Sequence, residues 1–153
     1  MEQSLIIFKP DSLQRGLVGS ILNRFENKGL KTIAMKMIRI SRQLAETHYA
    51  EHKGKDFFND VVSYITSGPV IVAVLEGPSA VSAIRQMLGA TDARIAQPGT
   101  IRGDFAISIR YNLVHGSDSV ESAKREIGIF FKPDELLDYD RDVLSKWVWQ
   151  TEN

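Results

Sequence analysis

Hydrophobic and polar positions follow two different periods along the chain, and each change of period marks the start of an expected element. Residues 4–8 (SLIIF) form a short apolar run that ends at a Lys-Pro-Asp sequence, as a buried strand would. From Leu17 the apolar side chains recur every three or four positions, and Gly29 stands where a helix end favours a left-handed residue. The pattern therefore predicts a strand followed by a helix over 17–28.

Residues 30–40 (LKTIAMKMIRI) allow two interpretations. Apolar side chains alternate through Ile33, Met35 and Met37 and then shift phase at Ile38, which is typical of a strand with an irregularity. A helix with a stripe of methionines is the alternative. We predict the strand.

Two helical pieces and a fully apolar strand follow. Ser41 can cap a helix over 42–52, and a second helical piece covers 57–65. Residues 69–75 are almost wholly apolar, which indicates a strand buried on both faces. The helix after this strand ends at Gly89 and carries an apolar stripe of Val81, Ile84, Met87 and Leu88.

The third quarter of the chain has weaker signals. Residues 89–104 show no sustained period, and a loop of this length inside a compact domain is usually functional or disordered. Phe105, Ile107 and Ile109 alternate, which predicts that a strand resumes there and continues irregularly to His115. The last helix follows, with Val120, Ala123, Ile127 and Phe130 on one stripe.

The order of elements predicts the fold class. Strands and helices alternate as β-α-β-α-β-α-β, with the second helical region as an insertion. This is the split β-α-β-β-α-β arrangement of the α+β, ferredoxin-like fold, an antiparallel sheet covered by helices on one face. We expect a single domain over residues 1–153, in which 132–153 form a charged C-terminal tail that ends in WVWQTEN.

Composition restricts the partners. The chain has 19 Lys and Arg and 19 Asp and Glu, so no net charge draws it to nucleic acid or to an anionic membrane, and any phosphate site must come from local clustering. It has no cysteine, which excludes thiol catalysis and disulfides. The longest apolar run, VIVAVL, is too short to span a membrane. We expect a soluble cytoplasmic protein that needs neither nucleic acid nor membrane.

The candidate chemistry lies in residues 112–119, NLVHGSDS. Asp118, three residues before Glu121, forms a variant of the capping box, so we expect the last helix to begin there. Its first amide donors would then point toward His115, and a neutral imidazole is a competent nucleophile toward phosphorus.

Two polar side chains could support this histidine. Ser117 is close enough in sequence to form a hydrogen bond beside it, and Glu126 is a candidate carboxylate to orient it. On these residues alone, a catalytic and a structural role for His115 are equally open.

Four segments resemble the nucleoside diphosphate kinase family, in the same order as in that family. They are IFKPDSLQRGLVGSILNRFENKGLK, FFNDVVSYITSGPVIVAVLEG, GATDARIAQPGTIRGDF and the active-site signature NLVHGSDSVESAKREIG. The resemblance covers 5–131, and an N-x-x-H-G-S-D-S run in its proper place is very specific. It implies a ping-pong reaction, in which the γ-phosphoryl group of a nucleoside triphosphate passes to a histidine and then to a nucleoside diphosphate.

The resemblance implies roles for individual residues. His115 matches the histidine that is phosphorylated on Nδ1, and Ser117 and Glu126 match its supporting pair. Lys9 matches the lysine that approaches the ribose and the transferring phosphate, and Asn112 matches the asparagine that also reaches the ribose.

Further matches concern the phosphates and the base. The matches to phosphate ligands are Arg85, Thr91 and Arg102, the match to the tyrosine near the histidine is Tyr49, and the matches to the stacking aromatic and its apolar partner are Phe57 and Val61. Stacking reads no hydrogen-bonding pattern, in keeping with the family's indifference to the base. The resemblance also implies Mg²⁺ held mainly by the nucleotide phosphates, with no metal ligand assigned to the chain.

Two rivals come from other classes. His48, Glu51 and His52 form an H-x-x-E-H sequence, the inverted motif of some zinc proteases, but an amphipathic helix with solvent-facing histidines is the preferred interpretation. Residues 102–105 (RGDF) are weakly similar to the start of an RNA-binding RNP1 strand, but the following aromatics are missing. No P-loop or G-x-G-x-x-G sequence is present.

The chain departs from the family pattern in two places. Arg110-Tyr111 replaces a more usual Gly-Arg, and Ala93 stands where many relatives have proline. The long tail resembles that of family members that assemble as hexamers, so we predict a homo-hexamer.

Overall fold

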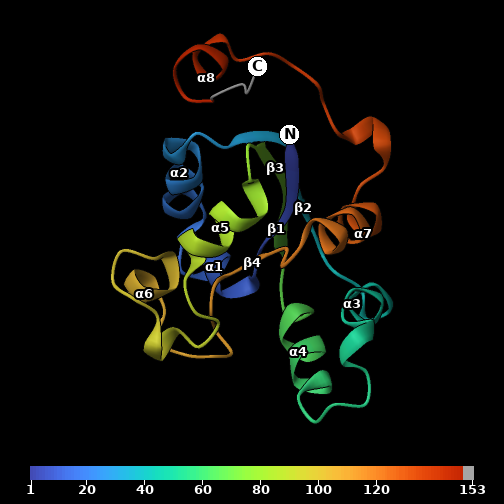
Figure 1. Cartoon of the computed structure of the whole chain (residues 1–153). Coiled ribbons are helices and arrows are strands. Elements are labelled where there is room, and N and C mark those ends of the chain that lie inside the picture. Colours follow the sequence, from blue (N-terminus) through green and yellow to red (C-terminus); the bar gives the residue numbers. More distant parts are fainter. Residues whose placement is uncertain (150–153) are drawn as a thin grey trace.

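The computed structural model describes residues 1–149, and 150–153, the end of the WVWQTEN sequence, lie outside the described residues. Its centre is a four-stranded sheet in the order β2-β3-β1-β4, in which all neighbours are antiparallel (Figure 1). The strands are β1 (Glu2–Phe8), β2 (Lys31–Ile38), β3 (Val70–Gly77) and β4 (Val114–Gly116). This strand order confirms the ferredoxin-like prediction.

The helices begin and end near the positions that the sequence patterns indicate. Gly29 closes α2 with φ 105°, and the Ser41 hydroxyl accepts a hydrogen bond from the backbone N–H of Leu44 to cap α3. The α-helices are α1 (Pro10–Gln14), α2 (Val18–Lys28), α3 (Arg42–His48), α4 (Phe58–Ile65), α5 (Ala80–Leu88), α6 (Ile101–Phe105), α7 (Val120–Phe130) and α8 (Asp142–Trp147). Short 3-10 turns lie at Ala50–His52, Ala93–Ile95 and Pro133–Glu135.

Helices cover both faces of the sheet, not one as expected. Alternate residues of β1 point into two separate hydrophobic cores, with Leu5 and Ile7 in one and Ile6 and Phe8 in the other. The core around Ile7 receives side chains from α3, α4 and α7, and the core around Ile6 receives them from α2, α5 and α6. Figure 1 shows these two groups of helices on opposite sides of the sheet. β1 is therefore buried on both faces, and the packing of both cores holds it in place.

Two sequence predictions in the loops were wrong. Ile107 and Ile109 do not form a strand, and their side chains are 85% and 55% exposed on an irregular segment. The aperiodic region 89–104 contains the start of α6. The expected end of the first strand is confirmed, since β1 ends at Phe8 and Pro10 begins α1.

The start of α7 also differs from the prediction. Ser119, not Asp118, is the capping residue, and its side chain accepts a hydrogen bond from the backbone N–H of Ser122. The Asp118 side chain is left exposed.

The strand prediction for residues 30–40 is confirmed, but its irregularity lies earlier than expected. The register of β2 against β3 shifts between Thr32 and Ala34, which indicates a bulge at Ile33. After the bulge, Met35 and Met37 face outward and are 41% and 64% exposed. The methionine stripe is therefore on the surface of an edge strand.

The C-terminal tail packs on the first half of this edge strand. The buried Lys31 donates a hydrogen bond to the carbonyl of Tyr139 and forms an ion pair with Glu76 at 3.3 Å. The Trp149 indole N–H donates to the carbonyl of Gly29, whereas Trp147 is 83% exposed. Among residues 1–149, no helix is both long enough and apolar enough to cross a bilayer.

We predict that a side chain at Gly103 destabilises the protein, because a Cβ there would lie 1.9 Å from the backbone oxygen of Gln97. We expect Gly103→Ala to lower the free energy of unfolding by about 1–3 kcal/mol through overpacking. The matched control is Gly128→Ala in α7, where a Cβ meets nothing within 4 Å, and it should raise stability by about 0.5–1 kcal/mol. Urea denaturation at one fixed protein concentration measures both, and a Gly103→Ala protein as stable as wild type would contradict the prediction.

Candidate active site

His115 lies on β4, where pairing with β1 places it opposite Ile7. Its Nε2 lies 2.8 Å from Oε1 of Glu126, which projects from α7. An ionised carboxylate can only accept, so Nε2 carries the hydrogen and donates it. The lone pair of the neutral imidazole is then on Nδ1, which makes Nδ1 the nucleophilic nitrogen.

Glu126 is held by a buried serine. The Ser117 hydroxyl donates to the same Oε1 atom at 2.8 Å and accepts a hydrogen bond from the backbone N–H of Leu5 at 3.0 Å. Burial raises the pKa of Glu126, but the hydrogen bond and charge of His115 and the hydrogen bond from Ser117 outweigh it, so the pKa lies below its usual value. Ser117 therefore supports Glu126 and not His115 directly.

Lys9 and Asn112 form a second polar group. The Lys9 ammonium donates to Oδ1 of Asn112 at 2.7 Å, and the Asn112 amide donates to the carbonyl of Thr91 at 3.0 Å. Burial, with a contribution from the nearby Arg102, lowers the pKa of Lys9 from 10.5 to about 7, although Asp11 opposes the shift. Near neutral pH, Lys9 is therefore present in both its charged and its neutral form.

A strained residue turns the chain toward the cleft. Leu113 is fully buried and has φ 75°, a left-handed conformation that a branched side chain rarely adopts. The Leu113 N–H donates to Oδ2 of Asp11 at 3.1 Å, and its carbonyl accepts from the Lys9 N–H at 2.9 Å. The other Asp11 oxygen accepts from the Tyr64 hydroxyl. Sequence reasoning missed Asp11 and Tyr64, because nothing in the sequence indicates the strained turn that they hold.

Two arginines bring positive charge to the cleft. The buried Arg102 donates to the carbonyls of Asn112, Gly89 and Val114. These bonds leave two of the five guanidinium N–H donors available. Burial, and then the charge of Arg85, lower the pKa of Arg102 to about 10, so it stays charged at neutral pH. Arg85 is exposed on α5.

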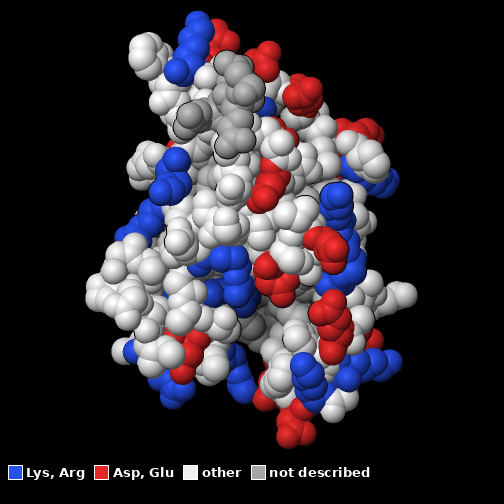
Figure 2. All heavy atoms as spheres, viewed as in Figure 1, with Lys and Arg blue, Asp and Glu red and all other residues white. Residues whose placement is uncertain are grey.

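Most of the predicted site residues line one cleft of about 290 Å³. They are Lys9, Tyr49, Arg85, Thr91, Arg102, Asn112, His115 and Glu126. Figure 2 shows basic side chains gathered near the middle of this face, at the level of α5 and β4. The cleft therefore combines a nucleophilic nitrogen with cations from distant segments, an arrangement suited to an anionic phosphoryl group.

Three predicted residues lie outside the lining of the cleft. Ser117 is buried behind Glu126. Phe57, just before α4, is 45% exposed, and its ring centroid lies 5.2 Å from that of His52. Val61 is half-buried on α4.

The segment before β4 is joined to α4. The Arg110 guanidinium forms an exposed ion pair with Asp60 at 2.9 Å, and the rings of Tyr111 and Tyr64 meet edge to face with centroids 5.3 Å apart. The unusual Arg110-Tyr111 pair therefore has a structural role, since both side chains contact α4.

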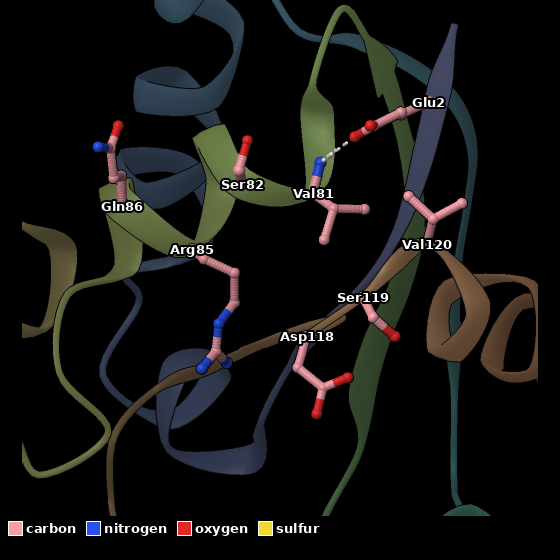
Figure 3. Close-up of a pocket in the computed structure, with 8 residues that line it drawn as sticks. All are labelled: Glu2, Val81, Ser82, Arg85, Gln86, Asp118, Ser119 and Val120. Carbon is pink, nitrogen blue, oxygen red and sulfur yellow. Dashed lines mark hydrogen bonds between the residues drawn. The ribbon is translucent and has the colours of Figure 1, made fainter.

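A second cavity, of about 600 Å³, lies between the starts of α5 and α7 (Figure 3). It shares Arg85 and Asp118 with the cleft, but the Glu2 carboxylate in it already accepts a hydrogen bond from the backbone N–H of Val81 (Figure 3). Its lining contains one cation and no histidine, so the chemistry belongs to the first cleft.

The H-x-x-E-H sequence does not form a zinc-protease site. His48 ends α3, whereas His52 lies in the following 3-10 turn. His48 is 5% exposed, not solvent-facing as expected, and its ring packs against His115 with centroids 5.1 Å apart. Sequence reasoning assigned it to a surface helix and so missed its position beside the nucleophile.

Known proteins resemble the whole chain. A family model described as nucleoside diphosphate kinase matches residues 2–136. A nucleoside diphosphate kinase of Desulforamulus reducens is 53% identical over 150 residues, which cover 98% of this chain and 100% of that protein. One of Pyrococcus furiosus is 56% identical over 142 residues, which cover 91% and 88%. The structure of a halophilic nucleoside diphosphate kinase from Halobacterium salinarum in complex with CDP superposes with a TM-score of 0.94 at 51% identity, and covers 97% of this chain and 99% of that chain.

Proposed function

The chain belongs to the nucleoside diphosphate kinase family, and from this premise we propose which of its residues perform the family's reaction. The enzyme transfers the γ-phosphoryl group of a nucleoside triphosphate to a nucleoside diphosphate through a phosphohistidine. We assign the phosphohistidine to His115. The observation that carries this assignment is the bond between Nε2 and Glu126, which leaves Nδ1 free at a cleft lined by Lys9, Arg85 and Arg102.

In the first half-reaction Nδ1 of His115 attacks the γ-phosphorus. The N–P bond forms while the bond from phosphorus to the bridging oxygen breaks, and the nucleoside diphosphate leaves with that electron pair. The ring becomes positive as it loses its lone pair to phosphorus, and the ionised Glu126 at 2.8 Å stabilises this charge. The second half-reaction is the reverse, with another nucleoside diphosphate as acceptor.

The cations position the phosphates and balance their charge. Arg102 has two donors left for phosphate oxygens, because carbonyls hold its other three in a fixed orientation. Arg85 is exposed at the cleft and is free to reorient toward a phosphate. Thr91 lies beside them and contributes its hydroxyl as a further donor.

Lys9 and Asn112 lie together at the cleft, and we assign them to the ribose, with Lys9 also approaching the transferring phosphate. Tyr49 lines the cleft near the nucleophile. The base stacks on Phe57, with Val61 as its apolar partner, because the exposed aromatic face of Phe57 is large enough to cover a base. The relative solved with CDP binds a cytosine nucleotide, and stacking accepts the other bases equally.

Mg²⁺ fits this donor set as an ion held mainly by the nucleotide. Glu126 is already bound to His115 and Ser117, whereas the exposed Asp118 at the cleft can hold the ion through water. When bound, the ion neutralises phosphate charge.

We propose that the chain is one domain over 1–153, that it works in the cytoplasm and that it assembles as a homo-hexamer. The tail contacts β2 through Lys31, which supports a single unit. The exposed Met35 and Met37 on the free edge of β2 support association, because an apolar edge strand favours pairing with another chain.

The assignment of His115 is tested with γ-labelled ATP and no acceptor. The wild-type protein should form an acid-labile phosphoenzyme at one label per chain, and His115→Ala should form none, because it lacks the nucleophilic nitrogen. The control is His52→Ala, which removes a histidine that does not contact Glu126 and should still take the label. Label retained on His115→Ala would rule out the assignment.

The low pKa of Lys9 predicts proton uptake on nucleotide binding. At pH 8 Lys9 with a pKa of about 7 is mostly neutral in the free protein, and a bound polyanion favours its charged form. ADP binding should therefore take up a proton at pH 8 and much less at pH 6, where Lys9 is already charged. Calorimetry in buffers of different ionisation enthalpy measures this, and Lys9→Met should abolish the difference. Equal uptake by Lys9→Met would contradict the prediction.

The assembly is tested by the mass in solution. Light scattering should give six times the chain mass of 17.2 kDa. Met37→Lys should lower that mass, because it places a charge on the exposed edge of β2. A monomeric or tetrameric wild-type protein would overturn the hexamer.

A further inference from the structure

His48 is a buried polar residue that the reaction as described does not use. Its ring packs edge to face on three others, with centroid distances of 4.6 Å to Tyr49, 5.1 Å to His115 and 5.3 Å to Phe130. Its Nδ1 is buried and has no hydrogen-bond partner among the described residues. A buried nitrogen without a partner is costly and rare in folded proteins, so any benefit of this side chain comes from the packing of its ring and not from that nitrogen.

The surroundings keep this imidazole neutral. Burial, and then the neighbouring His115, lower the pKa of His48 from 6.5 to about 3, although Glu126 opposes the shift. The nearby Arg125 and Lys9 lower it further. A neutral ring adds no positive charge beside His115, whose own ring becomes positive during transfer.

Metal binding does not explain the arrangement. One ligand atom each of His48, His115 and Glu126 lie within 4.8 Å of one another, which would suggest a site for zinc. However, Nε2 of His115 and Oε1 of Glu126 are already joined at 2.8 Å by a hydrogen bond, and Ser117 donates to the same oxygen. An ion would have to break both bonds, so the cluster is built for the hydrogen bonds and not for a metal.

Glu126 alone does not fix the plane of the nucleophilic ring. A hydrogen bond to one nitrogen leaves the ring of His115 able to tilt, because the second side-chain torsion of histidine has a broad minimum. A tilt moves Nδ1 away from the line of attack on phosphorus. The packed ring of His48, which itself contacts Phe130, opposes this tilt.

We propose that His48 is a positioning residue, whose neutral aromatic ring fixes the plane of His115 so that Nδ1 faces the phosphoryl group. The proposal rests on the assignment of His115 as the phosphorylated residue. It is the shape of the ring that matters, and the nitrogen atoms of His48 take no part. Phenylalanine should therefore replace His48, whereas a side chain of similar polarity without a six- or five-membered ring should not.

The test is the rate constant of phosphoenzyme formation, measured by rapid quench with saturating labelled ATP. His48→Ala and His48→Asn should lower this rate constant about 10-fold or more, because a small misplacement of a nucleophile has large kinetic effects. His48→Phe should stay within about 3-fold of wild type. The ATP concentration at half saturation should change little in all three, and the pH profile of His48→Phe should match that of wild type because His48 does not titrate in the working range.

Stability is separated from positioning by a matched control. Val62→Ala shortens a fully buried side chain in the same hydrophobic core that contains Phe130. Like His48→Ala, it should unfold more readily in urea, but it should keep the wild-type rate constant. Rates are compared where every variant is fully folded. The proposal is overturned if His48→Ala keeps the wild-type rate constant, or if His48→Asn is active and His48→Phe is not. A wild-type protein without phosphoenzyme would instead refute the assignment of His115.

Discussion

The pairing of β4 with β1 is the constraint on which the site depends. β4 is only three residues long, yet it joins a strand that is buried on both faces, so its position is fixed by the two cores. This pairing places His115 against α7, where Glu126 accepts a hydrogen bond from Nε2. The strained backbone of Leu113, held by Asp11, makes the turn that leads into β4. The geometry around His115 is thus built from rigid elements, with a strained residue two positions before it.

The chain has no net charge, and the charge in the cleft depends on how burial lowers the pKa of the basic residues that line it. Arg102 remains charged at neutral pH because its pKa, although lowered to about 10 by burial and by Arg85, is still well above 7, whereas burial lowers the pKa of Lys9 to about 7. In the proposed reaction an anionic nucleotide would favour the charged form of Lys9, so that the full cluster of three cations forms when phosphate is bound.

The two arginines and Lys9 could be named from the sequence, since each belongs to a segment that resembles one family. Their convergence could not be derived from spacing, because they come from the junction of β1 and α1, from α5 and from α6, which meet only after the sheet forms. The same limit explains the error at Ile107 and Ile109. Their alternation suggests a strand, but a strand requires a neighbour with free hydrogen-bonding groups, and the contacts of Arg110 and Tyr111 with α4 draw the segment away from the sheet.

The sequence by itself determined the fold class, the end of α2 at Gly29 and the cap of α3 at Ser41, because these depend on patterns that are local in the chain. A specific motif in it is also the basis for assigning His115 as the nucleophile. Only the tertiary structure decided that both faces of the sheet are covered, that His48 is buried against His115 and that Ser117 supports Glu126 and not the histidine. The physical reason is how far apart in the sequence the interacting residues lie. Caps and turns are set by neighbours along the chain, whereas burial and pKa are set by side chains that come close only when distant segments pack.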